Sequence, residues 1–180
     1  GIADAPVDHW LDDLDPEKNL HLIPTWNDTF KVVRCLQQKA ALRTLHEILQ
    51  KLDESTIVMY SATHEFSALV SSRDNVNLRK YAKTDSGVHI FAYKTFEIPE
   101  VPPVKGVVRS ENFHSCFVLW EKEDNAEMTN FAWMMNMDYK LPSLVPSSVF
   151  NEVCRWILSS TMKCMHKRAD VLRANPPPRS

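Results

Sequence analysis

Glycine is scarce in this chain, with only 3 among 180 residues. Glycine-rich loops let the backbone approach the phosphate groups of nucleotides closely. The sequence contains neither G-x-G-x-x-G nor a G-K-[ST] tripeptide. The scarcity of glycine therefore disfavours a phosphate-binding loop.

The chain also lacks a strong charge bias and long apolar runs. Its formal net charge is −2, whereas a nucleic-acid-binding domain calls for a basic face. No apolar run approaches the length of about 18 residues that spans a membrane. The N-terminal "GIADAPVDHWLDDLD" is acidic, unlike a secretory signal. We therefore expect a cytoplasmic protein without a nucleic-acid partner.

Metal-ligand and catalytic spacings are absent as well. The four cysteines lie far apart, at 35, 116, 154 and 164, so they are read as reduced core thiols. None of the seven histidines stands in a triad or zinc spacing. "HSC" (114–116) cannot form a dyad within itself, because alternate residues of a strand face opposite ways. We expect no metal, no cofactor and no enzymatic activity.

Helical patterns occupy both ends of the chain. An interrupted helix is predicted at 7–23, where Pro16 can open a second helical turn. Residues 38–54, "QKAALRTLHEILQKLDE", form an amphipathic helix with a leucine stripe. A long helix begins near Ser147 or Ser148, and one face carries Val149, Val153, Trp156, Ile157, Ser160 and Cys164.

Between these helices the hydrophobic period changes to that of strands. Turn signals such as "TDSG" separate runs rich in β-branched and aromatic residues. The six predicted strand segments are 55–63, 73–82, 87–96, 105–113, 114–123 and 128–139. The order of helices, strands and one long helix predicts an α+β domain over 1–172, with a curved antiparallel sheet covered by the last helix. The proline-rich residues 173–180 are predicted to be a disordered or extended tail.

The strand segment 73–82 has an unusual polar face. Asn75, Asn77 and Arg79 alternate with Val76 and Leu78. The alternation places both asparagines and Arg79 on one face, which is either solvent-exposed or a polar patch inside a binding site.

Four ordered motifs resemble those of the START family (steroidogenic acute regulatory protein-related lipid transfer). They are "WNDTF" (26–30), "VSSRDNVNLR" (70–79), "GVVRSEN" (106–112) and "FAWMMNMDYKLPSLV" (131–145). The resemblance covers roughly residues 10–168 and is best for the sterol-binding subgroup. It implies a helix-grip fold that shields a lipid in an internal tunnel.

The sequence departs from the family pattern in four places, one of which is the lack of a glycine between "D" and "LP" in "DYKLP". The family's N-terminal helix and first three strands are missing, and residues 38–54 resemble an insertion. Tyr60 stands at the position of the acid that pairs with the family's inward arginine, which corresponds to Arg79. Because a guanidinium keeps its charge, Arg79 needs another acid (Glu65, Asp74 or Glu111), water or an anionic ligand group, unless it is exposed at an open edge.

Arg73 and Asp74 are read differently, as a structural pair that caps loop backbone or pairs locally.

The resemblance predicts a binding site with polar and apolar parts. The polar part contains Arg79, Tyr60, Asn77 and Asn75. The apolar wall contains Val58, Ala62, Phe91, Phe113, Phe117, Phe131 and Trp133 from strands, and Val149, Phe150, Val153 and Ile157 from the last helix. The same apolar residues packed solid would form an ordinary core.

The resemblance implies non-covalent binding and intracellular transfer of a lipid, a sterol above all, with transient contact at organelle membranes. The last helix would gate the tunnel. Alternatives are a phospholipid, a carotenoid, or an interaction domain that has lost its cavity. The helix at 38–54 either packs on its own domain or joins a partner or second copy.

Overall fold

The computed structural model of the chain describes residues 1–36, 53, 55–65 and 70–175. The helices are α1 (Val7–Asp13), the 3-10 helix η1 (Leu20–Leu22), α2 (Ile23–Trp26) and α4 (Ser147–Ala174). The strands are β1 (Ile2–Ala3), β2 (Phe30–Cys35), β3 (Thr56–Thr63), β4 (Arg73–Lys83), β5 (His89–Thr95), β6 (Val108–Arg109), β7 (Glu111–Asn112), β8 (Ser115–Lys122), β9 (Asn125–Met134) and β10 (Met137–Asp138).

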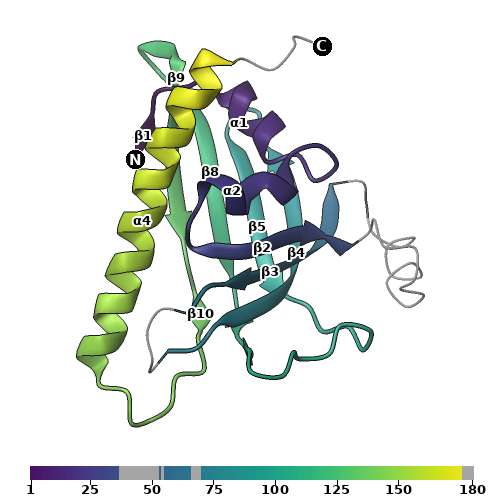
Figure 1. The fold of residues 1–180 in the computed structure, drawn as a ribbon. Helices are drawn as coiled ribbons and strands as arrows, with labels where there is room; N and C mark the ends of the chain where they lie inside the picture. Colours follow the sequence, from purple (N-terminus) through teal and green to yellow (C-terminus); the bar gives the residue numbers. More distant parts are fainter. Residues whose placement is uncertain (37–52, 54, 66–69, 176–180) are drawn as a thin grey trace.

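Seven strands form one curved antiparallel sheet in the order β1-β9-β8-β5-β4-β3-β2. Strand β6 joins β4 in parallel, and β7 and β10 form a separate pair. Helix α4 and the short N-terminal helices lie on the same side of the sheet (Figure 1). This is the helix-grip arrangement of the α+β class, as the sequence predicts.

The six predicted strand segments all contain strands. The "TDSG" turn is also confirmed, since the N–H of Thr84 donates to the Val88 carbonyl and Gly87 adopts a positive φ of 81°. A residue with a side chain is strained in this left-handed region, so glycine suits the hairpin. The predicted turn chemistry therefore fixes the register between β4 and β5.

Two strands at the edges of the sheet were not predicted. Strand β1 pairs with β9, and β2, from the "WNDTFKVVRC" segment, pairs with β3. The N-terminal region thus supplies both edge strands. The predicted second helical turn at Pro16 is wrong, because helix resumes only at Leu20. The helix predicted at 38–54 lies almost entirely outside the described residues.

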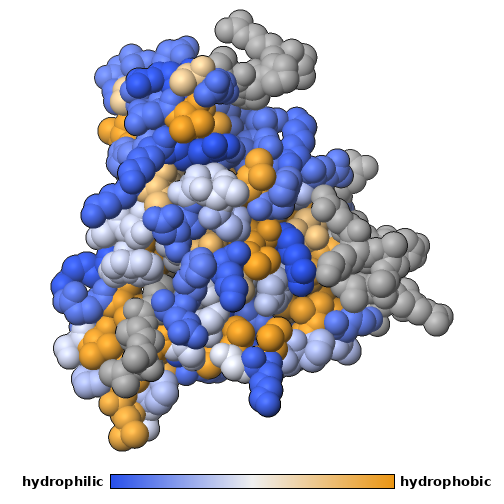
Figure 2. All heavy atoms as spheres, viewed as in Figure 1, coloured by the Kyte–Doolittle hydropathy of each residue, from blue (hydrophilic) through white to orange (hydrophobic). Residues whose placement is uncertain are grey.

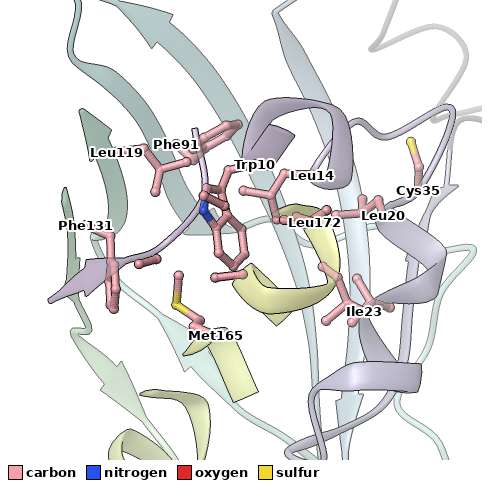
Figure 3. Close-up of a cluster of buried hydrophobic side chains, with 14 of the residues drawn as sticks. Trp10, Leu14, Leu20, Ile23, Cys35, Phe91, Leu119, Phe131, Met165 and Leu172 are labelled. Carbon is pink, nitrogen blue, oxygen red and sulfur yellow. The ribbon is translucent and has the colours of Figure 1, made fainter. Parts of the chain in front are cut away.

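The main hydrophobic core lies between the sheet and the helices. Trp10 of α1 is surrounded by Phe91, Leu119 and Phe131 from the sheet and by Met165 from α4 (Figure 3). Trp10 and Phe131 are each 1% exposed. This cluster joins both ends of the chain over the middle of the sheet.

A second apolar cluster lies on the opposite face of the sheet. Its buried members are Leu36, Val58, Tyr60, Ala62, Val76 and Ile98. Ile98 comes from the loop after β5, which covers this outer face. Strands β3 and β4 therefore bury side chains on both faces, as their near-continuous burial indicates.

Helix α4 carries its buried stripe further toward the C-terminus than predicted. Neither Ser147 nor Ser148 caps it, because Pro146 occupies the N-cap position. Trp156, predicted on the buried face, is 47% exposed. The buried residues are Ile157, Thr161, Cys164, Met165, Ala169 and Leu172. Within the described part of the chain, no helix has the length and apolar character to cross a membrane.

Candidate functional site

A cavity of about 160 Å³ lies between the sheet and the helices. Its walls combine strands β2, β3, β4, β5, β8 and β9 with the N-terminal helices and α4. The apolar lining residues are Trp10, Leu14, Leu20, Ile23, Trp26, Phe30, Val33, Met59, Phe117, Trp133, Met135, Met137 and Met165. The polar lining residues are Asn27, Ser61, Asn75, Asn77, Tyr93, Asn112, Ser115 and Thr161.

Alternation along β4 sets the polar wall of the cavity. Asn75 and Asn77 both line the cavity, whereas Val76 belongs to the outer cluster. The strand face predicted from the sequence is therefore confirmed. Ser61 of β3 lies opposite Asn75 and adds a hydroxyl to the same wall.

Two asparagines of this wall accept hydrogen bonds from serine side chains. Ser110 Oγ donates to Asn75 Oδ1 at 2.7 Å, and Ser115 Oγ donates to Asn112 Oδ1 at 2.6 Å. Each asparagine amide group is thus oriented by a serine. The wall offers fixed, uncharged donors and acceptors.

Arg79 lies under the N-terminal helices and does not line the cavity. Its side chain is buried, at 4% exposed, and Nη1 donates to the Leu14 carbonyl at 2.9 Å. Leu14 is the C-cap of α1, where the helix dipole presents partial negative charge. The guanidinium also lies 5.2 Å from the centre of the Phe91 ring.

Tyr93 completes the surroundings of Arg79. Burial raises the pKa of Tyr93, while the adjacent Arg79 acts in the opposite direction through charge and a hydrogen bond. No carboxylate of the described residues lies within ion-pair distance of Arg79. Of the predicted acids, Asp74 pairs with Arg109 and Glu111 pairs with Lys140. A helix end and two aromatic side chains therefore stabilise Arg79.

Tyr60 and Val58 face away from the cavity, so their predicted placement is wrong. Antiparallel pairing sets Tyr60 opposite Val76 and Val58 opposite Leu78, which puts all four on the outer face. Ala62 follows the same alternation. The pairing with β4, and not the family position of Tyr60, decides which face of β3 points inward.

On the outer face Tyr60 takes part in a second polar network. Arg109 donates to Asp74 through Nε at 2.7 Å and Nη2 at 3.0 Å, and Asp74 is completely buried. Burial raises the pKa of Tyr60, and its interaction with the Asp74 carboxylate raises it further. Arg34 lies 4.8 Å from the centre of the Tyr60 ring. Tyr60 thus belongs to a structural network.

Arg73 braces the loops at the start of β4. Its Nε donates to the Tyr139 carbonyl at 3.2 Å, and Nη1 donates to the Ser71 carbonyl. Its predicted structural role is therefore supported, although its neighbour Asp74 pairs with Arg109 rather than locally.

The predicted aromatic wall is divided between cavity, core and surface. Trp133 and Phe117 line the cavity. Phe91 and Phe131 instead pack in the main core. Phe113 is 44% exposed, because it lies in the turn between β7 and β8.

The predicted contribution of α4 is displaced along the helix. Three of the predicted residues do not line the cavity: Val149, Phe150 and Val153. Phe150 instead packs against Tyr139, with 6.5 Å between the ring centroids. Ile157 is buried without lining the cavity. Thr161 and Met165, one and two turns further, contribute to the wall. The cavity therefore lies opposite the middle of α4.

The N-terminal helices supply a wall that the sequence did not assign to the site. Trp10 and Leu14 come from α1 and its C-cap, and Trp26 comes from α2. Asp13 Oδ1 and Oδ2 accept from Arg168 of α4, which fixes these helices over the cavity. The sequence predicts a helix in this region, but not what it covers.

Four buried polar atoms at the cavity lack a partner in the described part of the chain. They are Asn77 Oδ1, Thr161 Oγ1, Trp10 Nε1 and Trp26 Nε1. Buried polar groups in native proteins are nearly always hydrogen-bonded, so each exception calls for an explanation, and a bound ligand is one. Among the described residues, no group of three or more His, Cys, Asp or Glu side chains could hold a metal ion.

Residues 18–173 match the START domain. The chain belongs to the START family. The steroidogenic acute regulatory protein, mitochondrial, of Danio rerio is 31% identical over 140 residues, which cover 75% of this chain and 42% of the relative. The human protein of the same name is 26% identical over 157 residues, or 84% of this chain and 47% of the relative. The chain thus spans about half the length of these curated relatives.

Solved START structures share the fold. Human StAR-related lipid transfer protein 5 superposes with a TM-score of 0.77 and 17% identity, covering 96% of this chain and 74% of that structure. Human STARD10 gives a TM-score of 0.71 at 17% identity, covering 96% and 63% of the respective chains. At these identities the likeness shows the fold alone.

Proposed function

We propose that this START domain binds a neutral lipid, preferably a sterol, in the cavity and carries it between membranes without covalent chemistry. The observation that carries the proposal is the combination of apolar and uncharged polar groups on the cavity wall. None of the described residues that line the cavity is charged. The names of the relatives, steroidogenic acute regulatory proteins, support a sterol as the ligand.

The position of Arg79 favours a neutral ligand over an anionic one. A phosphate or carboxylate in the cavity would need a cation, because burying an unpaired charge is strongly unfavourable. Arg79 is turned toward Leu14 and Phe91, so it does not supply that charge. The hydroxyl of a sterol needs only the asparagine and serine groups that are present.

The cavity must widen to accept a sterol. Pockets for ligands of this size run from about 300 Å³ upward, compared with about 160 Å³ here. Methionine side chains are flexible and repack at low cost. Four of them line the cavity, so widening does not require the sheet to unfold: Met59, Met135, Met137 and Met165.

The start of α4 is the proposed contact with membranes. Figure 2 shows apolar atoms gathered at the lower left, over the loop before α4 and the beginning of that helix. Leu144 is 92% exposed and Trp156 is 47% exposed. Insertion of these side chains among lipid headgroups would bring the gating helix to the bilayer, at the cytoplasmic face of organelle membranes.

Ligand content and transfer test this function directly. The purified protein is titrated with radiolabelled cholesterol, and transfer is followed between donor and acceptor phosphatidylcholine vesicles. The expected result is one sterol bound per chain and protein-dependent transfer.

Binding of phosphatidylcholine or a carotenoid in place of cholesterol would overturn the sterol assignment. A protein that binds none of these lipids would be an interaction domain instead. The predicted association through residues 38–54 lies outside the described residues. It stays a prediction that sedimentation at several protein concentrations can check.

A further inference from the structure

Two unpartnered polar atoms belong to side chains that line the cavity from opposite layers of the fold. Asn77 Oδ1 belongs to β4 in the sheet, and Thr161 Oγ1 belongs to α4 in the helical layer. Asn77 is 4% exposed and Thr161 is 5% exposed. No hydrogen bond joins them to each other or to another described residue. Each atom thus has unused hydrogen-bonding capacity on a side chain that lines the cavity.

Thr161 is unfavourable for folding at its position. It interrupts the apolar stripe that contains Ile157 and Met165. Threonine is a weaker helix former than leucine or methionine. A buried hydroxyl without a partner also destabilises the folded state relative to a methyl group of the same shape. Valine would satisfy the core better at a similar helix propensity, so the hydroxyl requires another explanation.

Other polar side chains of the same cavity do not share this feature. Asn75 is held by Ser110, and Asn112 is held by Ser115. Serine side chains therefore satisfy the Oδ1 atoms of both these asparagines. The exceptions on the helical layer are Thr161 and the Trp10 and Trp26 N–H groups, and all three can donate. The exception on the sheet, Asn77 Oδ1, can only accept.

We infer that the ligand carries two oxygen atoms, one facing the sheet and one facing α4, and that Thr161 determines specificity for the oxygen that faces α4. One oxygen is a hydroxyl that donates to Asn77 Oδ1. The other, a hydroxyl or a carbonyl, accepts from the Thr161 hydroxyl. This inference rests on the proposed sterol function and narrows it to an oxygenated sterol over cholesterol itself.

The test compares three ligands and three forms of the protein. Cholesterol carries one oxygen, whereas 7-ketocholesterol and 25-hydroxycholesterol each carry a second at a different place. Their dissociation constants are measured with the wild-type protein, with Thr161→Val and with Ser159→Ala. The Ser159→Ala variant removes a neighbouring hydroxyl from the exposed face of α4 and serves as the matched control.

The wild-type protein should bind at least one of the two-oxygen sterols about tenfold more tightly than cholesterol, the effect of one additional hydrogen bond. Thr161→Val should abolish that preference and leave cholesterol affinity within about twofold, because valine keeps the shape of the side chain. Ser159→Ala should retain the preference. The ligand-free Thr161→Val protein should unfold at the same temperature as the wild type, or higher.

Three results would overturn the inference. The first is a wild-type protein that binds cholesterol at least as tightly as both oxygenated sterols. The second is a Thr161→Val variant that still prefers an oxygenated sterol to cholesterol. The third is a Thr161→Val variant that is less stable than the wild type, because the hydroxyl would then serve the fold. Failure of every sterol to bind would instead reject the proposed function, and the two failures are therefore distinguishable.

Discussion

The two faces of strand β4 bury polar side chains in opposite ways. On the outer face Asp74 is fully buried and receives two hydrogen bonds from Arg109. On the inner face Asn77 is nearly as buried, yet its Oδ1 has no partner among the described residues. The same strand thus carries a satisfied network and an unsatisfied atom only three residues apart.

This difference separates residues that stabilise the fold from residues that await a ligand. A satisfied buried network orders its surroundings, and removal of one member leaves the others unpaired. An unsatisfied atom costs stability in the free protein and is compensated only when something binds. The exposed fractions of Asp74 and Asn77 alone do not distinguish these two roles.

The largest expected effect is the loss of the outer network. Asp74→Asn leaves the Arg109 guanidinium without its carboxylate and should lower the free energy of unfolding by about 3 kcal/mol. Urea denaturation measures this change. Glu152→Gln, which removes an exposed partner of Arg155, should change it by less than about 1 kcal/mol. Similar values for both variants would contradict the structural role of the outer face.

Arg79→Met should also act on folding rather than on binding. The Leu14 carbonyl loses a charged donor, which should lower the free energy of unfolding by about 2 kcal/mol. Cholesterol affinity, measured below the unfolding transition, should stay within about twofold because Arg79 does not line the cavity. A large loss of affinity in a stable variant would return Arg79 to the binding site.

Asn77→Leu should show the opposite pattern. The free energy of unfolding should stay constant or rise, while cholesterol affinity falls about fivefold through loss of one hydrogen bond. Asn75→Leu is the matched variant on the same face, and it should lower stability because the 2.7 Å hydrogen bond from Ser110 Oγ is lost. Equal losses of stability in the two variants would erase the distinction between paired and unpaired groups.

The smallest expected effect concerns His89, which is hydrogen-bonded to Tyr81 at 2.8 Å. Burial lowers the pKa of His89, and nearby Lys83 lowers it further, while Asp8 of α1 opposes both. The unfolded chain therefore takes up a proton below about pH 6.5, where folded His89 does not.

Stability should thus fall as the pH drops through this range. Unfolding free energies between pH 7.5 and 5.5 measure the slope, which should be shallower for His89→Phe. An identical slope in the variant would assign the pH dependence to other groups.

Much of the fold could be predicted from the sequence because its signals are local. Alternation located the strands from 55 onward, and "TDSG" located the hairpin between β4 and β5. The two edge strands were missed because their pairing depends on distant partners. Strand β1, for example, pairs only two residues with β9, around Asn130.

The site was predicted less completely, for a physical reason. The face of β4 followed from alternation within one strand, so Asn75 and Asn77 were placed correctly. The face of β3 depends on register with β4, and an error of one residue moves Tyr60 and Val58 to the opposite side. The position along α4 opposite the cavity, and the cover by Trp10 and Leu14, depend on tertiary packing that no local pattern encodes.

The ion pair between Asp13 and Arg168 joins residues 155 positions apart in the chain. During synthesis the N-terminal helices leave the ribosome long before α4 exists, and their apolar faces have no helical partner until then. Contacts of such long sequence separation form late and slowly. We expect the nascent domain to need a chaperone, or an early lipid, until its last thirty or so residues emerge.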